Sequence, residues 1–106
     1  MKPDDIDWGP GEVVHWSLEK FDADRSLQEQ LDELREDLAQ VRFDEHTLLD
    51  LGWYPECDAD GAFVVTVVRN EDWDEPVFRE AAKAVPSLHS ALARAVSVAT
   101  EQATVS

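Results

Sequence analysis

The stretch from Glu56 to Gly61 is the part of the sequence most typical of a metal site. Its acids stand at alternate positions before a glycine, as in a calcium loop with ligands at positions 1, 3, 5 and 12. Position 12, however, is Val67, where such a loop needs a bidentate glutamate. Asp60-Gly61 also favours a tight reversal of the chain. We therefore expect a hairpin turn here, with no metal and no other cofactor.

A second possible chemistry is a cysteine nucleophile or a zinc site, built from Cys57 and the histidines at 15, 46 and 89. No two of these residues have the short spacing of metal ligands, and no nucleophile signature surrounds Cys57. The chain has four glycines and no phosphate-binding glycine loop. We therefore expect no catalytic residue and no enzyme. A Cys–His pair assembled from distant positions is the alternative.

Trp73 stands in a run of acids, in a segment (residues 70–76) whose composition predicts a loop. An exposed tryptophan surrounded by negative charge is typical of a binding hot spot for a basic partner. In the alternative interpretation, Trp73 folds back over the hydrophobic core and only the acids face water. The same two interpretations apply to Trp53 and Tyr54, at the end of a predicted strand.

The charge of the chain is strongly negative. Its 106 residues include 24 acidic and 9 basic ones, for a net charge of −15. Residues 22–60 hold 13 of the acids and 3 of the bases, and so carry −10 of this charge. Such a field repels nucleic acid and anionic membranes and attracts basic proteins. Solubility alone is the other explanation of the charge.

Length and composition indicate one domain in a reducing compartment. A chain of 106 residues suits a single domain. It has one cysteine, so no internal disulfide can form, and it has neither a secretory signal nor an apolar run of the ~20 residues that span a bilayer. We expect a cytoplasmic protein.

Residues 26–41 carry the pattern of an amphipathic helix. Ser26 and Glu29 have the spacing of a capping box at the start of a helix. The apolar residues behind them recur at helical spacing, at Leu27, Leu31, Leu34, Leu38 and Val41. Acids occupy the other faces, so we expect a helix of about four turns with one negative face.

The rest of the chain predicts strands and a final helix. Residues 47–54 and 62–69 are predicted strands that pair as an antiparallel hairpin. Residues 77–84 are a weaker third strand, with helix as the alternative, and a last helix begins near Pro86. The expected fold is α+β, in the order helix-strand-strand-strand-helix, with a three-stranded antiparallel sheet and both helices on one face. We expect one domain over residues 1–106, with a core at 26–101 and an N-terminal extension, residues 1–25, of uncertain structure.

Three motifs occur in this order: Leu51-Gly52-Trp53-Tyr54-Pro55, Asp58-Ala59-Asp60-Gly61-Ala62-Phe63 and Glu71-Asp72-Trp73-Asp74-Glu75-Pro76. Over residues 47–80 the chain resembles the small immunity proteins of bacterial polymorphic and contact-dependent growth inhibition toxin systems. The resemblance implies a cytoplasmic inhibitor that binds one toxin domain and blocks its active site. Such toxins are often nucleases with basic grooves. The resemblance assigns no binding residues.

The hypothesis is therefore an acidic protein inhibitor of a cognate basic toxin, with no nucleic-acid or membrane partner, and a monomer by itself. Charge guides the encounter and aromatic side chains anchor the complex. The candidate partner-binding residues are first Asp58, Asp60, Asp72, Trp73, Asp74 and Glu75, and second Glu33, Glu36 and Asp37. The alternatives are an acidic secretion or effector chaperone, which acts as a dimer, and a DNA mimic that blocks a DNA-binding protein.

Overall fold

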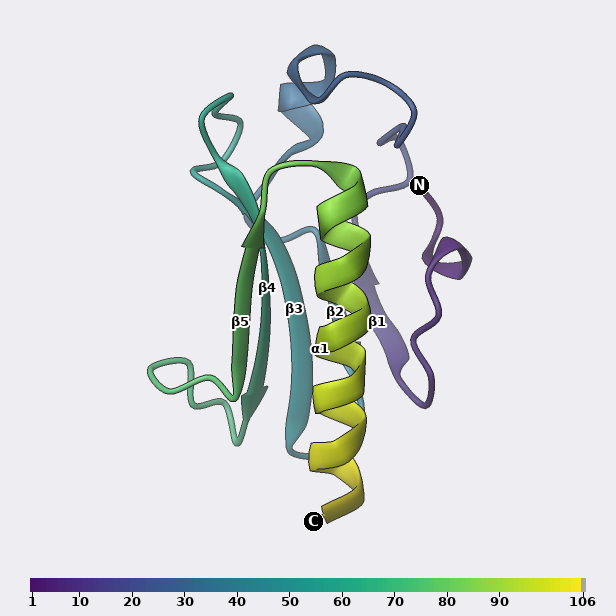
Figure 1. The fold of residues 1–106 in the computed structure, drawn as a ribbon, viewed down its shortest axis with the longest axis vertical. Helices are drawn as coiled ribbons and strands as arrows, with labels where there is room; N and C mark the ends of the chain where they lie inside the picture. The colour runs from purple at the N-terminus through teal and green to yellow at the C-terminus, as the bar shows by residue number, and fades with distance from the viewer. Residues whose placement is uncertain (106) are drawn as a thin grey trace.

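The computed structural model of the protein describes residues 1–105. They form a five-stranded antiparallel sheet with one long helix, α1, along one of its faces (Figure 1). Strands that are neighbours in the sequence are also neighbours in the sheet. The strands are β1 (Glu12–Trp16), β2 (Ala39–Arg42), β3 (Thr47–Tyr54), β4 (Ala62–Arg69) and β5 (Phe78–Ala82), α1 spans Val85–Val105, and the 3-10 helices η1 and η2 span Pro3–Asp5 and Leu27–Glu33.

The β3–β4 hairpin confirms the sequence prediction, and both strands have the predicted bounds. They pair along their whole length, from Thr47 opposite Arg69 to Tyr54 opposite Ala62. The valine-rich run of β4 favours this structure because branched side chains pack well on a pleated surface. β5 forms within the weaker predicted strand, and α1 begins with Pro86 in its first turn, as predicted.

The predicted three-stranded sheet with a helix on either side of it in the sequence is wrong. β1 and β2 extend the sheet to five strands. A shift of register between Val13 and His15 breaks the alternation of β1, which therefore has no clear period-two pattern. β2 does alternate between buried and more exposed residues, but over only four residues, and it overlaps the end of the leucine pattern that predicted a helix. Within residues 1–105, α1 is the one α-helix, and it packs on β3, β4 and β5.

The helix predicted over residues 26–41 is also wrong. Ser26 is an N-cap, and its hydroxyl oxygen accepts a hydrogen bond from the Gln28 amide at 3.2 Å. Only the 3-10 helix η2 follows, with a kink at Gln30, and β2 then takes up the end of the predicted helix.

Backbone hydrogen bonds to the β3–β4 hairpin replace the expected helical ones after η2. The Leu34 carbonyl accepts from the Cys57 amide at 2.7 Å, and the Arg35 carbonyl accepts from the Trp53 amide at 2.8 Å. Leu34 and Leu38 are fully buried in this arrangement, as they would be on the inner side of a helix. Leucine spacing therefore could not separate the two structures, because the choice depends on where the backbone groups find partners.

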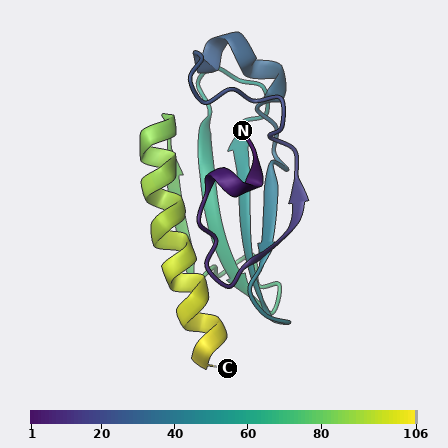
Figure 2. The same cartoon turned by 90° about the vertical axis from the view of Figure 1, so that its right-hand side faces the viewer.

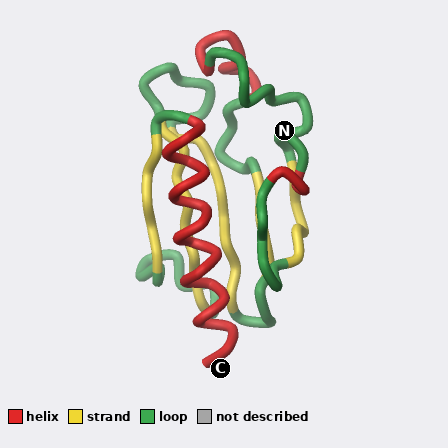
Figure 3. The backbone as a smooth tube through the Cα atoms, turned by 45° about the vertical axis from the view of Figure 1, so that its right-hand side comes forward, coloured by secondary structure: helices red, strands yellow, loops and turns green. Residues whose placement is uncertain are grey.

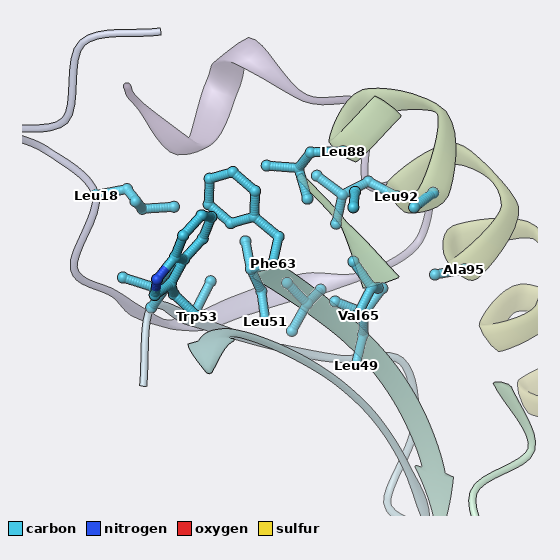
Figure 4. Packing of buried hydrophobic residues seen from close by; sticks show 14 of the residues in the cluster. Leu18, Leu49, Leu51, Trp53, Phe63, Val65, Leu88, Leu92 and Ala95 are labelled. Atoms are coloured by element: carbon cyan, nitrogen blue, oxygen red, sulfur yellow. The ribbon is translucent and has the colours of Figure 1, made fainter. Parts of the chain in front are cut away.

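The hydrophobic core lies between the sheet and α1 (Figure 4). Phe63 is at its centre: its ring meets that of Trp53 edge to face at 4.9 Å, and that of Phe21 at 6.2 Å. Leu88, Leu92 and Ala95 close the core from α1. None of the helices in residues 1–105 combines the length and the apolar character needed to span a bilayer.

Apart from β1, which belongs to the sheet, the first 25 residues fold onto the same side of the sheet as α1 (Figure 3). Trp8, Leu18 and Phe21 are buried in the core, and Trp8 meets the ring of Trp16 edge to face at 6.1 Å. The segment is therefore part of the packed domain, and together with α1 it covers one face of the sheet.

Candidate partner-binding surface

Within residues 1–105, no helix lies on the face of the sheet opposite α1 (Figure 2). Side chains alternate between the two faces along each strand, so those that follow core residues of β3 and β4 point away from α1. Val64 and Val68 show this, because they are buried but lie outside the core cluster. We call this surface the open face; strand pairing places on it His15, Gln40, Arg42, Leu48, Asp50, Tyr54, Val64, Thr66, Val68, Arg79 and Ala81.

A row of polar residues crosses the open face, with one residue from each strand. His15 pairs with Gln40, which pairs with Asp50. Asp50 pairs with Thr66, and Thr66 pairs with Arg79 on β5. The row places one carboxylate at the centre of the sheet, flanked by neutral groups, with the cationic side chain of Arg79 two strands away.

A hollow of about 190 Å³ opens on this face beside Asp50. Its other lining residues are Tyr54, Val64, Thr66, Trp73, Pro76 and Arg79. Tyr54 and Trp73 are the large aromatic side chains of the lining, and 42% and 49% of their surfaces are exposed. The hollow therefore combines a carboxylate with two accessible aromatic side chains.

Trp73 is carried by the loop between β4 and β5, residues 70–77. Asn70 and Glu71 turn the chain with φ near +60°, and the Val77 amide returns to the Val67 carbonyl at 2.9 Å. Inside the loop the Trp73 amide donates to the Glu71 carbonyl at 3.1 Å, and Trp73 projects from the loop outside the core.

The indole N–H of Trp73 differs from those of the three other tryptophans. Trp8, Trp16 and Trp53 donate theirs to the carbonyls of Pro3, Met1 and Asp58, at 2.8–2.9 Å. Within the described residues the Trp73 indole has no such acceptor. Trp73 thus offers an exposed ring and a free donor, as in the first interpretation. Trp53 is buried in the core, as in the second interpretation.

Asp50 is a half-buried carboxylate whose hydrogen-bond partner is neutral. The Gln40 Nε2 donates to its Oδ1 at 3.2 Å, and no basic side chain in residues 1–105 forms an ion pair with it. Burial raises the pKa of Asp50; the Gln40 hydrogen bond lowers it, nearby Asp37 raises it, and His15 lowers it. The charged form of Asp50 is therefore costly in the free protein.

Tyr54 is held over the open face by Gly52. A methyl group at Gly52 would lie 2.7 Å from the Tyr54 Cε2, so the ring occupies the space of the missing side chain. The Tyr54 hydroxyl donates to the Glu36 carbonyl at 3.2 Å. Burial, together with Asp50 and Glu36, raises the pKa of Tyr54. Tyr54 thus stays protonated, and its hydroxyl hydrogen bond connects the lining of the hollow to the segment before β2.

Five of the predicted acids meet at one end of the sheet (Figure 1). Asp58 and Asp60 lie in the loop after β3, Glu33 is the last residue of η2, and Glu36 and Asp37 lie between η2 and β2. The Cys57–Leu34 backbone hydrogen bond joins the two segments. We call this cluster the upper acidic end; Glu33 is half-buried and the other four residues are exposed.

The remaining predicted acids lie at the other end of the sheet (Figure 1). Asp72, Asp74 and Glu75 are in the loop after β4. The eight residues of the strand β4 itself span about 26 Å. We call this loop, residues 70–77, the lower acidic loop. The predicted residues thus form two separate surfaces at opposite ends of β4, with the open face between them.

Neither family models, nor curated proteins, nor solved structures match this chain.

The residues considered for metal binding or nucleophilic chemistry have separate positions. Cys57 is a free, exposed thiol in the loop after β3. His15 lies on β1, with its Nε2 3.0 Å from the Asp37 carbonyl oxygen and 2.9 Å from the Ser17 hydroxyl. Residues 1–105 contain no group of three His, Cys, Asp or Glu side chains placed to hold a metal ion.

Sequence reasoning missed the centre of the surface, Asp50, and its neighbours Gln40 and Arg79. A signal for Asp50 was present, because it is the one acid within the predicted strand 47–54. Nothing local indicated Gln40 and Arg79, since they join Asp50 only through the pairing of β2 with β3 and of β4 with β5.

Replacing Asp50 with asparagine is expected to stabilise the free protein at pH 7 by a few degrees in Tm. The raised pKa of Asp50 means that the folded state favours the protonated carboxyl group. The stability that protonated Asp50 contributes is therefore full below the ordinary pKa of an aspartate, and it is lost as the pH rises through the raised pKa of the folded state. The gain of Asp50→Asn should therefore vanish at a pH below about 4. Thermal unfolding from pH 3.5 to 7 measures it. Asp74→Asn, in an exposed loop, is the control; an equal gain there would contradict the role of burial.

Moderate salt is expected to raise the Tm. Nine basic residues cannot neutralise 24 acids, and the ion pairs Arg25–Glu29 and Arg94–Glu80 are both at the surface. Screening at about 0.15 M salt shortens the range of the remaining repulsion to about 8 Å. Calorimetry in sodium chloride from low to moderate concentration tests this. A Tm that does not change with salt would show that the acids are too dispersed to repel one another.

Proposed function

We propose that the protein is a stoichiometric inhibitor that binds a basic protein and blocks its active site. The observation that carries this proposal is the open face, where Trp73 and Tyr54 lie exposed around Asp50 between two acidic ends. Exposed aromatic residues in a hollow are typical anchors of protein complexes, and flanking charge raises the rate of encounter.

The mechanism is occlusion. Acids at both ends of the sheet attract a cationic groove, and the open face then docks into it and keeps substrate out. A nuclease fits this mechanism because its groove is basic in order to hold phosphates. The resemblance of residues 47–80 to immunity proteins of bacterial toxin systems supports the same partner, a cognate toxin met in the cytoplasm.

Co-expression with the product of the adjacent gene tests the proposal. We expect a one-to-one complex whose affinity falls as salt rises, together with loss of the partner's activity. Light scattering of the protein alone is the second measurement, and a monomer is expected. A stable dimer that captures an unfolded client without inhibiting it would contradict the proposal and favour a chaperone.

A further inference from the structure

The carboxylate of Asp50 has no cationic partner within the described residues, and the hollow beside it can accommodate one. Its Oδ1 accepts from the neutral Gln40 amide, and no basic side chain in residues 1–105 lies within ion-pair distance of it. A half-buried carboxylate without a cation costs free energy that a cation from outside would recover. The hollow of about 190 Å³ beside Asp50 provides a place for it.

The lining of this hollow favours a guanidinium group over an ammonium group. Tyr54 and Trp73 are both half-exposed in the lining. A planar guanidinium stacks on aromatic rings, binds a carboxylate through two N–H groups and is weakly hydrated, whereas an ammonium ion is compact and strongly hydrated.

Arg79 is the one basic residue in the lining, and it sets where the cation can bind. It is separated from Asp50 by β4, about 10 Å away across the two strand spacings. On the other side, Asp37 adds negative potential near Asp50, and Glu36 does so near Tyr54; the opposing effects of His15 on Asp50 and of Arg79 on Tyr54 are smaller. An incoming cation is therefore favoured at the Asp50–Tyr54 side of the hollow and repelled from the β5 side.

We infer that the hollow formed by Asp50, Tyr54, Thr66 and Trp73 binds one arginine side chain of the basic partner. The inference rests on the proposed function for the identity of the partner. The chemistry of the hollow is independent of that identity and can be tested with a small probe.

The probe is the blocked peptide acetyl-Gly-Arg-Gly-amide, titrated at low salt and followed by NMR of the four tryptophan indole N–H groups. We expect saturable shifts of the Trp73 signal, whereas the hydrogen-bonded indoles of Trp8, Trp16 and Trp53 keep theirs. The matching citrulline peptide has nearly the same shape without the charge, and should bind about tenfold more weakly or not at all. The lysine peptide should also bind more weakly than arginine. Equal binding of citrulline or of lysine would overturn the inference.

Three variants complete the test. Asp50→Asn keeps an acceptor for Gln40 and should weaken arginine binding about tenfold. Glu101→Gln removes an exposed acid on α1, on the other side of the sheet from the hollow, and should leave the affinity within about twofold. Arg79→Ala should leave binding unchanged or tighter, because it removes a repelling charge. Full binding by Asp50→Asn, or weaker binding by Arg79→Ala, would contradict the inference.

The outcomes separate the inference from the proposed function. If Asp50→Asn retains the full affinity of the co-expressed partner, the inhibitor proposal stands and the arginine site is wrong. If the peptide binds as expected but no basic partner is inhibited, the site stands and the inhibitor proposal is wrong.

Discussion

Replacing Gly52 with alanine is expected to lower the free energy of unfolding by about 3 kcal/mol. The new Cβ would lie 2.1 Å from the backbone oxygen of Glu36 and 2.7 Å from the Tyr54 ring, and a backbone atom cannot rotate away. Either β3 or the segment before β2 must move, and with it the hydrogen bond from the Trp53 amide to the Arg35 carbonyl. Urea unfolding measures the loss, which corresponds to a Tm lower by roughly 10–20 °C.

Thr66→Ala is the matched control for Gly52→Ala. Thr66 faces the same side of the sheet from β4, and its replacement removes atoms from the surface instead of adding one at a close contact. We expect it to cost at most about 1 kcal/mol, mainly in strand preference. If Gly52→Ala were as stable as Thr66→Ala, the close approach of Glu36 to β3 would be contradicted.

Gly52 also links stability to the proposed function. The alanine side chain would displace the Tyr54 ring, which lines the hollow and donates to the Glu36 carbonyl. Arginine binding should therefore fall together with stability in Gly52→Ala, whereas in Asp50→Asn binding falls and stability rises. Opposite changes in binding and stability are typical of a residue kept for function at a cost to the fold.

The sequence was sufficient where structure is set locally. β3, β4 and their hairpin follow from a run of branched residues and from Asp60-Gly61, whose signals lie within the segment itself. α1 follows from its apolar stripe and from Pro86 in its first turn.

The sequence was insufficient where distant backbone groups decide the structure. Residues 34–38 leave the helical pattern because the ends of β3 and the loop after it offer them hydrogen bonds. The same limit applies to the candidate surface. Trp73 could be singled out by its neighbours, but its proximity to Asp50 and Tyr54 depends on the sheet register and on the fold of the lower acidic loop.

Reversing two charges in the lower acidic loop, by Asp72→Lys with Asp74→Lys, is expected to slow association with the basic partner about tenfold at low salt. Both acids are exposed and flank Trp73, so they act on the approach of the partner more than on the formed contact. Dissociation should change by less than about threefold, because charges at the rim of an interface act mainly on the rate of association. Stopped-flow or surface-plasmon kinetics at two salt concentrations measure both rates.

The control for this pair makes the same change of charge away from the open face, by Asp4→Lys in η1 with Glu101→Lys in α1. If the two double variants slow association equally, the effect belongs to the net charge of −15 and not to the lower acidic loop. A larger effect of the loop variant places the partner near Trp73.

Reversal of Asp58 and Asp60 then tests how far the contact extends, because those acids lie about 26 Å away along β4. A partner that spans the open face must respond to both ends, whereas one bound only at Trp73 responds to the lower loop.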